Sequence, residues 1–310
     1  MTKMYFLKFW LVFTLSSTLV SYSQKNSQNL DWIPFTWASD SISGKLIDKT
    51  GIIISVTIDE LPHKFNMQLD LGAVTTCFYG KILNVYLEKY PALNNKLDTT
   101  KKFRILGEEN PMFRNINLRL GKVAFRNVDV GLFRNFGDES SNAYMGVIAP
   151  DLFQNKVLII DYKLSRLAVA DTLSSEYQDV SFENFKTKEG RIKIPLLING
   201  KVEDLLFDTG SSIFSLVTTK QNALEIGESE IVDSLIVPSW GENIALYGLK
   251  TVVPIMFGNK KLENSIVFYD ENVNFDNFYK SEKIWGITGN AFFLNDVVII
   301  DYKNNRFGVK

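Results

Sequence analysis

A long internal repeat is the feature that most restricts how this chain of 310 residues can fold. Residues 145–170 read MGVIAPDLFQNKVLIIDYKLSRLAVA, and residues 285–310 read WGITGNAFFLNDVVIIDYKNNRFGVK. At a constant offset of 140 residues, eleven of the 26 aligned positions are identical without a gap. Chance would give only about one or two identities, so the sequence predicts two copies of one structural unit.

Each copy also carries an aspartate at the end of an apolar segment, followed by residues typical of a tight turn. The two segments read LDLGAVTT, which contains Asp70, and LLFDTGSS, which contains Asp208. The two aspartates are 138 residues apart, which is close to the offset of the repeat. A buried, unpaired carboxylate costs several kcal/mol. Two such carboxylates at matching positions therefore predict a paired site rather than two ordinary turns.

Most of the remaining sequence predicts β-strands. Pairs of apolar segments precede both aspartates, and Asn199-Gly200 is a strong signal for a two-residue hairpin. We therefore predict an all-β protein with two homologous units, a first unit at residues 49–171 and a second unit at residues 189–310. The polar segment 172–188 is the predicted linker, and residues 24–48 are the predicted N-terminal extension.

The N-terminus has the layout of a secretory signal peptide over residues 1–23. Lys3 and Lys8 precede an apolar run, and small residues follow it around Ser23. The run at 9–20 is 12 residues long, whereas a membrane span needs about 20. We expect cleavage near Ser23 and a periplasmic or secreted protein with no stable membrane span, the alternative being an uncleaved N-terminal anchor.

Composition excludes several classes of function. The formal net charge of −1 gives no electrostatic attraction for nucleic acid, so we expect no nucleic-acid partner. Cys77 is the single cysteine, which excludes an intramolecular disulfide and a cysteine-based zinc site. His63 is the single histidine and lies in an expected hairpin turn. Carboxylates and hydroxyls are thus the main chemistry available, and we expect neither a metal nor a cofactor.

These motifs together resemble the aspartic peptidase family. Its pepsin-like and retropepsin-like members have a hydrophobic strand ending in D-T-G-S, and an apolar segment with the pattern G-x-x-F follows near the end of each lobe. The resemblance runs from about Gly51 to Lys310. It implies two pepsin- or retropepsin-like β-barrel lobes with a catalytic cleft between them. It also implies an endopeptidase that binds a polypeptide substrate in the inter-lobe cleft, and we expect a monomer.

The resemblance assigns catalysis to Asp70 and Asp208. One carboxylate would activate a bound water, and the other, protonated, would donate to the scissile carbonyl. The implied supporting loop residues are Gly72, Thr209, Gly210, Ser211 and Gly289. Hydroxyls beside Asp208 are expected to donate hydrogen bonds to it and to lower its pKa. We therefore expect Asp208 to be ionised and Asp70 to hold the shared proton.

The first unit departs from the family pattern. Leu71 stands where the family has Thr, and Ala149 stands where it has Gly. Residues 103–113 contain no flap tyrosine, whereas Tyr247 lies at the matching hairpin of the second unit. The alternative function is therefore a catalytically inactive pepsin-fold protein that binds or inhibits another protein. A third reading is a pair of retropepsin-like lobes that need dimerisation or processing. The presence of both aspartates favours the enzyme.

Overall fold

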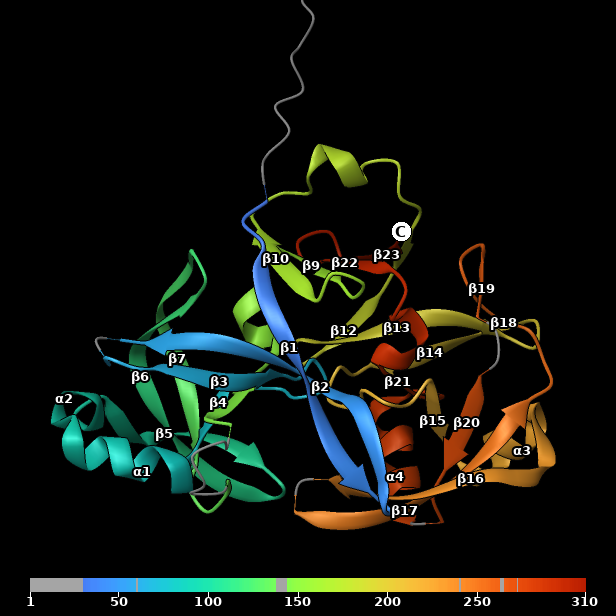
Figure 1. The fold of residues 1–310 in the computed structure, drawn as a ribbon, viewed down its shortest axis with the longest axis horizontal. Coiled ribbons are helices and arrows are strands. Elements are labelled where there is room, and N and C mark those ends of the chain that lie inside the picture. Colours follow the sequence, from blue (N-terminus) through green and yellow to red (C-terminus); the bar gives the residue numbers. More distant parts are fainter. Residues whose placement is uncertain (1–29, 60, 138–143, 240, 263–264, 272) are drawn as a thin grey trace, which may run out of the picture.

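The computed structural model describes residues 30–59, 61–137, 144–239, 241–262, 265–271 and 273–310 (Figure 1). The predicted signal peptide 1–23 and residues 24–29 of the predicted extension lie outside these ranges. Two large sheets dominate the described chain, and its helices are few and short. The all-β prediction is therefore confirmed at the level of secondary structure.

The N-terminal part and the first unit together run from β1 to β10. The elements are β1 (Ile33–Ile42), β2 (Lys45–Ile58), β3 (Lys64–Leu69), β4 (Cys77–Tyr79), α1 (Gly80–Lys89), α2 (Pro91–Asn94), β5 (Leu97–Ile105), β6 (Glu108–Leu120), β7 (Val123–Phe133), β8 (Gly146–Ile148), η1 (Pro150–Phe153), β9 (Val157–Asp161) and β10 (Arg166–Ala170).

The segment between the units and the second unit continue the chain in a similar order. The elements are η2 (Ser175–Tyr177), β11 (Phe182–Asn184), β12 (Lys186–Lys188), β13 (Arg191–Ile198), β14 (Lys201–Phe207), β15 (Leu216–Thr218), α3 (Lys220–Ile226), β16 (Gly227–Ser239), β17 (Glu242–Thr251), β18 (Ile255–Phe257), β19 (Lys260–Leu262), β20 (Ile266–Tyr269), α4 (Val273–Glu282), β21 (Gly286–Thr288), η3 (Asn290–Phe293), β22 (Val297–Asp301) and β23 (Arg306–Val309).

Strand pairing repeats between the two units. In the first, β3 pairs in parallel with β8, and β8 pairs in antiparallel with β4; in the second, β14, β21 and β15 are arranged in the same way. The hairpin of β13 and β14 turns at Asn199 and Gly200, whose φ angles are 49° and 80°. Positive φ at both positions is the requirement of a type I′ turn, so the predicted hairpin is confirmed.

The two units share a sheet that contains β9, β10, β22 and β23. In Figure 1 these strands lie between the units, in the upper part of the view. Strands β9 and β22 are antiparallel, and Ile159 pairs with Ile299, its counterpart at the offset of 140. Equivalent residues can face each other in this way only where an approximate two-fold axis passes between them. The repeat in the sequence is therefore also a spatial repeat about β9 and β22.

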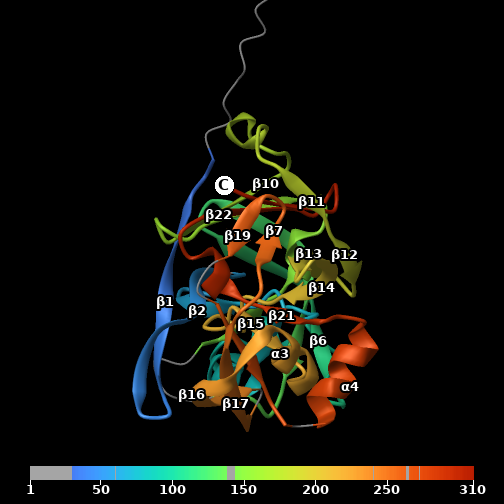
Figure 2. The same ribbon diagram turned by 90° about the vertical axis from the view of Figure 1, so that its right-hand side faces the viewer.

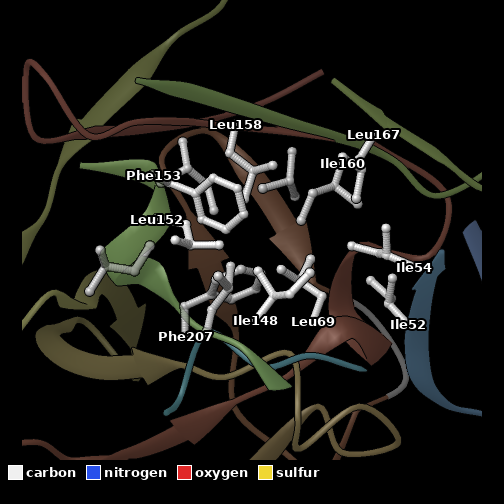
Figure 3. Packing of buried hydrophobic residues seen from close by; sticks show 14 of the residues in the cluster. Ile52, Ile54, Leu69, Ile148, Leu152, Phe153, Leu158, Ile160, Leu167 and Phe207 are labelled. Atoms are coloured by element: carbon white, nitrogen blue, oxygen red, sulfur yellow. The ribbon is translucent and has the colours of Figure 1, made fainter. Parts of the chain in front are cut away.

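The main apolar core reaches the residues that precede both aspartates. Leu69 ends β3 and Phe207 ends β14, and both side chains are fully buried in one cluster (Figure 3). Ile148 lies between them in the same view. Burial of a large apolar side chain stabilises the fold by about 2 kcal/mol or more, so the ends of these strands are held firmly.

The N-terminal part is built into the fold. Strand β1 pairs with β10 and with β2, and Figure 2 shows this blue hairpin running along one edge of the molecule. At its tip, the backbone N–H of Ile236 donates to Ser43 Oγ at 2.8 Å, and Lys45 pairs with Asp233 at 2.9 Å. The hairpin thus connects the shared sheet to β16 of the second unit.

The predicted linker, residues 172–188, contains regular structure. Strands β11 and β12 lie within 172–188, and β11 extends the shared sheet by pairing with β23. Tyr177, in η2, is buried in a cluster with Val157 and Ile299. A polar, aperiodic segment can pair as a strand because its backbone supplies the hydrogen bonds. Among the described residues, no helix has both the length and the apolar character needed to cross a membrane.

Removal of residues 24–48 is expected to destabilise the protein strongly. Strand β1 would be lost together with the buried side chains of Ile33 and Phe35. The lost burial is worth more than about 4 kcal/mol, at about 2 kcal/mol for each side chain. Urea unfolding of chains 24–310 and 49–310 measures the effect. Equal unfolding midpoints would contradict an integral role of β1 and would fit a removable pro-segment.

Candidate active site

The two aspartates begin two loops that are anchored in the same way. Asp70 follows β3, and its backbone N–H donates to the carbonyl of Ile148 at 2.9 Å. Asp208 follows β14, and its N–H donates to the carbonyl of Thr288, also at 2.9 Å. Ile148 and Thr288 end the matching strands β8 and β21. The repeat therefore places both carboxyl groups by the same backbone contacts.

The two loops interlock through their glycines. A Cβ atom on Gly72 would lie 2.3 Å from Cγ of Asp208, and one on Gly210 would lie 2.9 Å from Cγ of Asp70. Each glycine of one loop therefore packs against the carboxyl of the other, and no larger residue fits. The two carboxyl groups are close enough to hydrogen-bond to each other. The predicted residues Asp70, Asp208, Gly72 and Gly210 thus come together in one site.

Backbone N–H groups stabilise both carboxylates. Gly72 and Ala73 each donate to Oδ1 of Asp70 at 3.0 Å, and Gly210 donates to Oδ1 of Asp208 at 2.8 Å. The backbone N–H of Ser211 also interacts with Asp208. Ser211 therefore supports the site through its backbone N–H and not through its hydroxyl, which the sequence had predicted as the donor.

Thr209 ties the two loops together rather than donating to Asp208. Its hydroxyl accepts a hydrogen bond from the N–H of Leu71 at 2.9 Å and donates to the carbonyl of Leu69 at 2.7 Å. The expectation that this hydroxyl donates to Asp208 is therefore wrong, because its single proton is already used. Leu71 has no hydroxyl and cannot make the matching bonds to the loop of Asp208. The hydroxyl of Thr209 therefore links the two loops without a counterpart from Leu71.

Burial raises the pKa of both carboxyl groups. For Asp70, burial acts together with the charge of Asp208, and the pKa lies well above its ordinary value of 3.8. For Asp208, burial also raises the pKa, and the N–H groups of Gly210 and Ser211 oppose that rise. The expected lowering at Asp208 is therefore wrong. Burial favours the protonated form of both groups, and the assignment of the shared proton to Asp70 stays a prediction.

Gly289 occupies a position where a side chain does not fit. A Cβ atom there would lie 1.9 Å from the carbonyl oxygen of Ser211, and the N–H of Gly289 donates to the carbonyl of Phe214 at 3.1 Å. In the first unit, the N–H of Ala149 donates instead to Thr76 Oγ1 at 3.0 Å. The backbone N–H at this position therefore has a different acceptor in each unit, a side-chain hydroxyl at Ala149 and a backbone carbonyl at Gly289.

Several supporting residues were not predicted from the sequence. Thr76 donates through its hydroxyl and its N–H to Asp151, at 2.5 and 2.9 Å. In the second unit, Asn290 is fully buried and bonds to Ser212 at 2.9 Å. Asp151 and Asn290 both lie inside the aligned repeat blocks. Asn290 is a polar residue in the otherwise apolar segment around Gly289, and this is the pattern in the sequence that could have identified it as a supporting residue.

Tyr247 lies on β17, beside Tyr269, with ring centroids 5.7 Å apart. It lines a cavity of about 300 Å³ together with Asn243 and Asp270.

In the part of the chain that the structure describes, no three His, Cys, Asp or Glu side chains lie close enough to hold a metal ion. No protein-family model matches this chain, and no curated protein is detectably similar to it.

Replacing Thr209 with valine is expected to lower the free energy of unfolding by about 2 to 4 kcal/mol, because it leaves two buried backbone groups without partners. These groups are the N–H of Leu71 and the carbonyl of Leu69. Urea unfolding measures the change, with Thr36→Val on the exposed side of β1 as the matched control. Equal losses in the two variants would show that the connection between the loops is not stabilising.

Replacing Asp70 with asparagine is expected to stabilise the protein at neutral pH. Because burial raises its pKa, the folded protein binds more protons than the unfolded chain above the ordinary value of 3.8. The stability contributed by this group is full below that value and is lost as pH rises through the raised pKa. Urea unfolding at several pH values should show Asp70→Asn above the parent at neutral pH and the gap closing toward pH 3.8.

The control for this comparison is Asp171→Asn, since the side chain of Asp171 is 85% exposed. Parallel stability profiles for the parent and Asp70→Asn would mean that Asp70 does not have a raised pKa.

Proposed function

We propose that this chain is an aspartic-type endopeptidase with two pepsin- or retropepsin-like lobes. The observation that carries the proposal is the pair of Asp70, which is buried, and Asp208, which is half-buried, each packed against the glycine of the other loop. The repeated pairing of β3, β8 and β4 with that of β14, β21 and β15 supports the two-lobed arrangement. A fold alone does not determine function, so the proposal rests on the site.

The chemistry follows from two carboxyl groups that share one proton. Asp208, ionised, takes a proton from a water molecule held between the two groups, and the water oxygen attacks the carbonyl carbon of a peptide bond. Asp70 gives its proton to the carbonyl oxygen. The tetrahedral intermediate then breaks its C–N bond: the amine nitrogen takes a proton from Asp208, and one hydroxyl of the intermediate returns a proton to Asp70 as the new carboxyl group forms. Both carboxyl groups return to their starting states, so no cofactor is needed.

The substrate in this proposal is a polypeptide bound between the two units. The export of the mature protein to the periplasm or the outside of the cell belongs to the same proposal and rests on the sequence of residues 1–23. The alternative is an inactive pepsin-fold binding or inhibitory protein. The leucine at position 71 favours this alternative. It has no hydroxyl, so the loops lack one of the hydrogen bonds that would hold them rigid.

Cleavage of denatured protein from about pH 3 to pH 7 tests the proposal, with and without a pepstatin-type transition-state mimic. We expect the parent to cleave and the mimic to stop cleavage. Asp70→Asn and Asp208→Asn should each lose at least about a thousandfold in rate, since either change removes a group that acts in the transition state.

Asp171→Asn is the matched control, because it makes the same change at an exposed carboxylate. It should cleave like the parent. If the parent cleaves nothing in this pH range, or if both dyad variants cleave like the parent, the peptidase proposal is overturned and the binding protein takes its place.

A further inference from the structure

Asn290 is a buried polar residue directly behind the loop of Asp208. Its side chain is fully buried, and its amide nitrogen donates to the carbonyl of Thr209 at 3.1 Å and to Ser212 Oγ at 2.9 Å. Its amide oxygen accepts from the hydroxyl of Tyr162 at 2.7 Å. A carbonyl oxygen only accepts, so the atom facing Thr209 must be the amide nitrogen, which fixes the orientation of the Asn290 side chain.

The bond from Asn290 to the carbonyl of Thr209 also orients the N–H of Gly210, on the other side of the same peptide group. The carbonyl of Thr209 and the N–H of Gly210 belong to one planar, trans peptide unit, so they point in opposite directions. Asn290 holds the carbonyl, and the N–H donates to Oδ1 of Asp208 at 2.8 Å. Fixing the carbonyl therefore aims the N–H at the carboxylate. Donation to the carbonyl also polarises the peptide and strengthens its N–H as a donor.

Tyr162 fixes Asn290 in turn, and it comes from the other unit. It follows β9, whereas Asn290 begins η3, 128 residues later in the chain. Ser212, the second acceptor of the Asn290 amide, donates to the carbonyl of Lys49 on β2 at 2.7 Å. The side chain of Asn290 is thus held between elements of both units and cannot rotate without losing several bonds.

The first unit lacks this arrangement. At the offset of 140 residues, the counterpart of Asn290 is Pro150, which has no amide to donate to Leu71. The counterpart of Tyr162 is Tyr302, whose buried hydroxyl has no hydrogen-bond partner among the described residues. The repeat therefore supplies a matched comparison: the loop of Asp208 is held by Asn290 and Tyr162, and the loop of Asp70 has no such contact from Pro150 and Tyr302.

We propose that Asn290, oriented by Tyr162, is a positioning residue that aims the N–H of Gly210 at Asp208 and makes Asp208 the ionised member of the pair. This inference rests on the proposed function, because it assigns the proton within the proposed catalytic pair. Asn290 acts through the Thr209–Gly210 peptide and does not itself touch the reacting groups.

The electrostatic surroundings agree with this assignment. Among the described residues, the titratable group that faces Asp208 is Asp70 of the opposite loop. The N–H of Gly210 is the largest of the contacts that oppose the rise in the pKa of Asp208 caused by burial. Asp70 also accepts two backbone N–H bonds, from Gly72 and Ala73, so the feature that distinguishes the two loops is the side chain of Asn290 behind the loop of Asp208.

Titration of Asp208 alone provides the test. In the Asp70→Asn variant, the ¹³C carboxyl NMR signal of Asp208 reports its pKa without coupling to a second acid. Adding Tyr162→Phe should raise that pKa by about 0.5 to 1 unit, a three- to tenfold change in the ionisation constant. Adding Tyr302→Phe, the matched control, should leave it unchanged. In the Asp208→Asn variant, Tyr162→Phe should not move the pKa of Asp70.

Equal pKa values of Asp208 with and without the Tyr162 hydroxyl would overturn the inference, as would equal shifts from both tyrosine variants. If Tyr162→Phe does not fold, Ser212→Ala removes another partner of Asn290, and the same titration applies with a shift in the same direction. The titration needs no turnover. A protein that cleaves nothing but shows the shift contradicts only the proposed function, and an active protein without the shift contradicts only this inference.

Discussion

Two acidic groups that face each other, Asp70 buried and Asp208 half-buried, are the constraint on which the rest of this structure depends. Burial and mutual repulsion both disfavour ionisation, and the contacts of Asp208 and Asp70 include backbone N–H groups in place of a cation. Such donors work only if the loops are held still. The parallel strands beneath the loops, the interlocked glycines and the hydroxyl of Thr209 provide that rigidity.

The internal repeat explains how two carboxyl groups come to face each other, but it does not explain which of them carries the proton. Two copies of one loop place two carboxyl groups about an approximate two-fold axis, as the pairing of Ile159 with Ile299 indicates. A symmetric pair, however, gives no preference for which group carries the proton. The differences between the copies lie at positions that contact the loops, with Thr209 opposite Leu71 and Asn290 opposite Pro150. These changes distinguish two otherwise equivalent acids.

The sequence predicted the repeat, the mostly β secondary structure and the meeting of both aspartates, because each leaves a local pattern that occurs twice. It did not predict β11 and β12, since pairing by the backbone needs no apolar alternation. Nor did it predict the bond from Tyr162 to Asn290, which joins residues 128 positions apart. The direction of the Thr209 hydroxyl was predicted wrongly for a related reason. A choice between two acceptors depends on the opposite loop, which no local pattern describes.

The energetics of the pair also bear on the choice between an enzyme and a binding protein. Because the pKa of Asp70 is raised by burial and by Asp208, carrying this group as an acid costs stability at neutral pH. An asparagine would keep the shape and the hydrogen bonds from Gly72 and Ala73 to the side-chain oxygen. A site that served only to hold the units together would therefore be more stable with an amide there. The proposed acid–base catalysis gives a reason to keep two acids at this position, because that chemistry uses the proton itself.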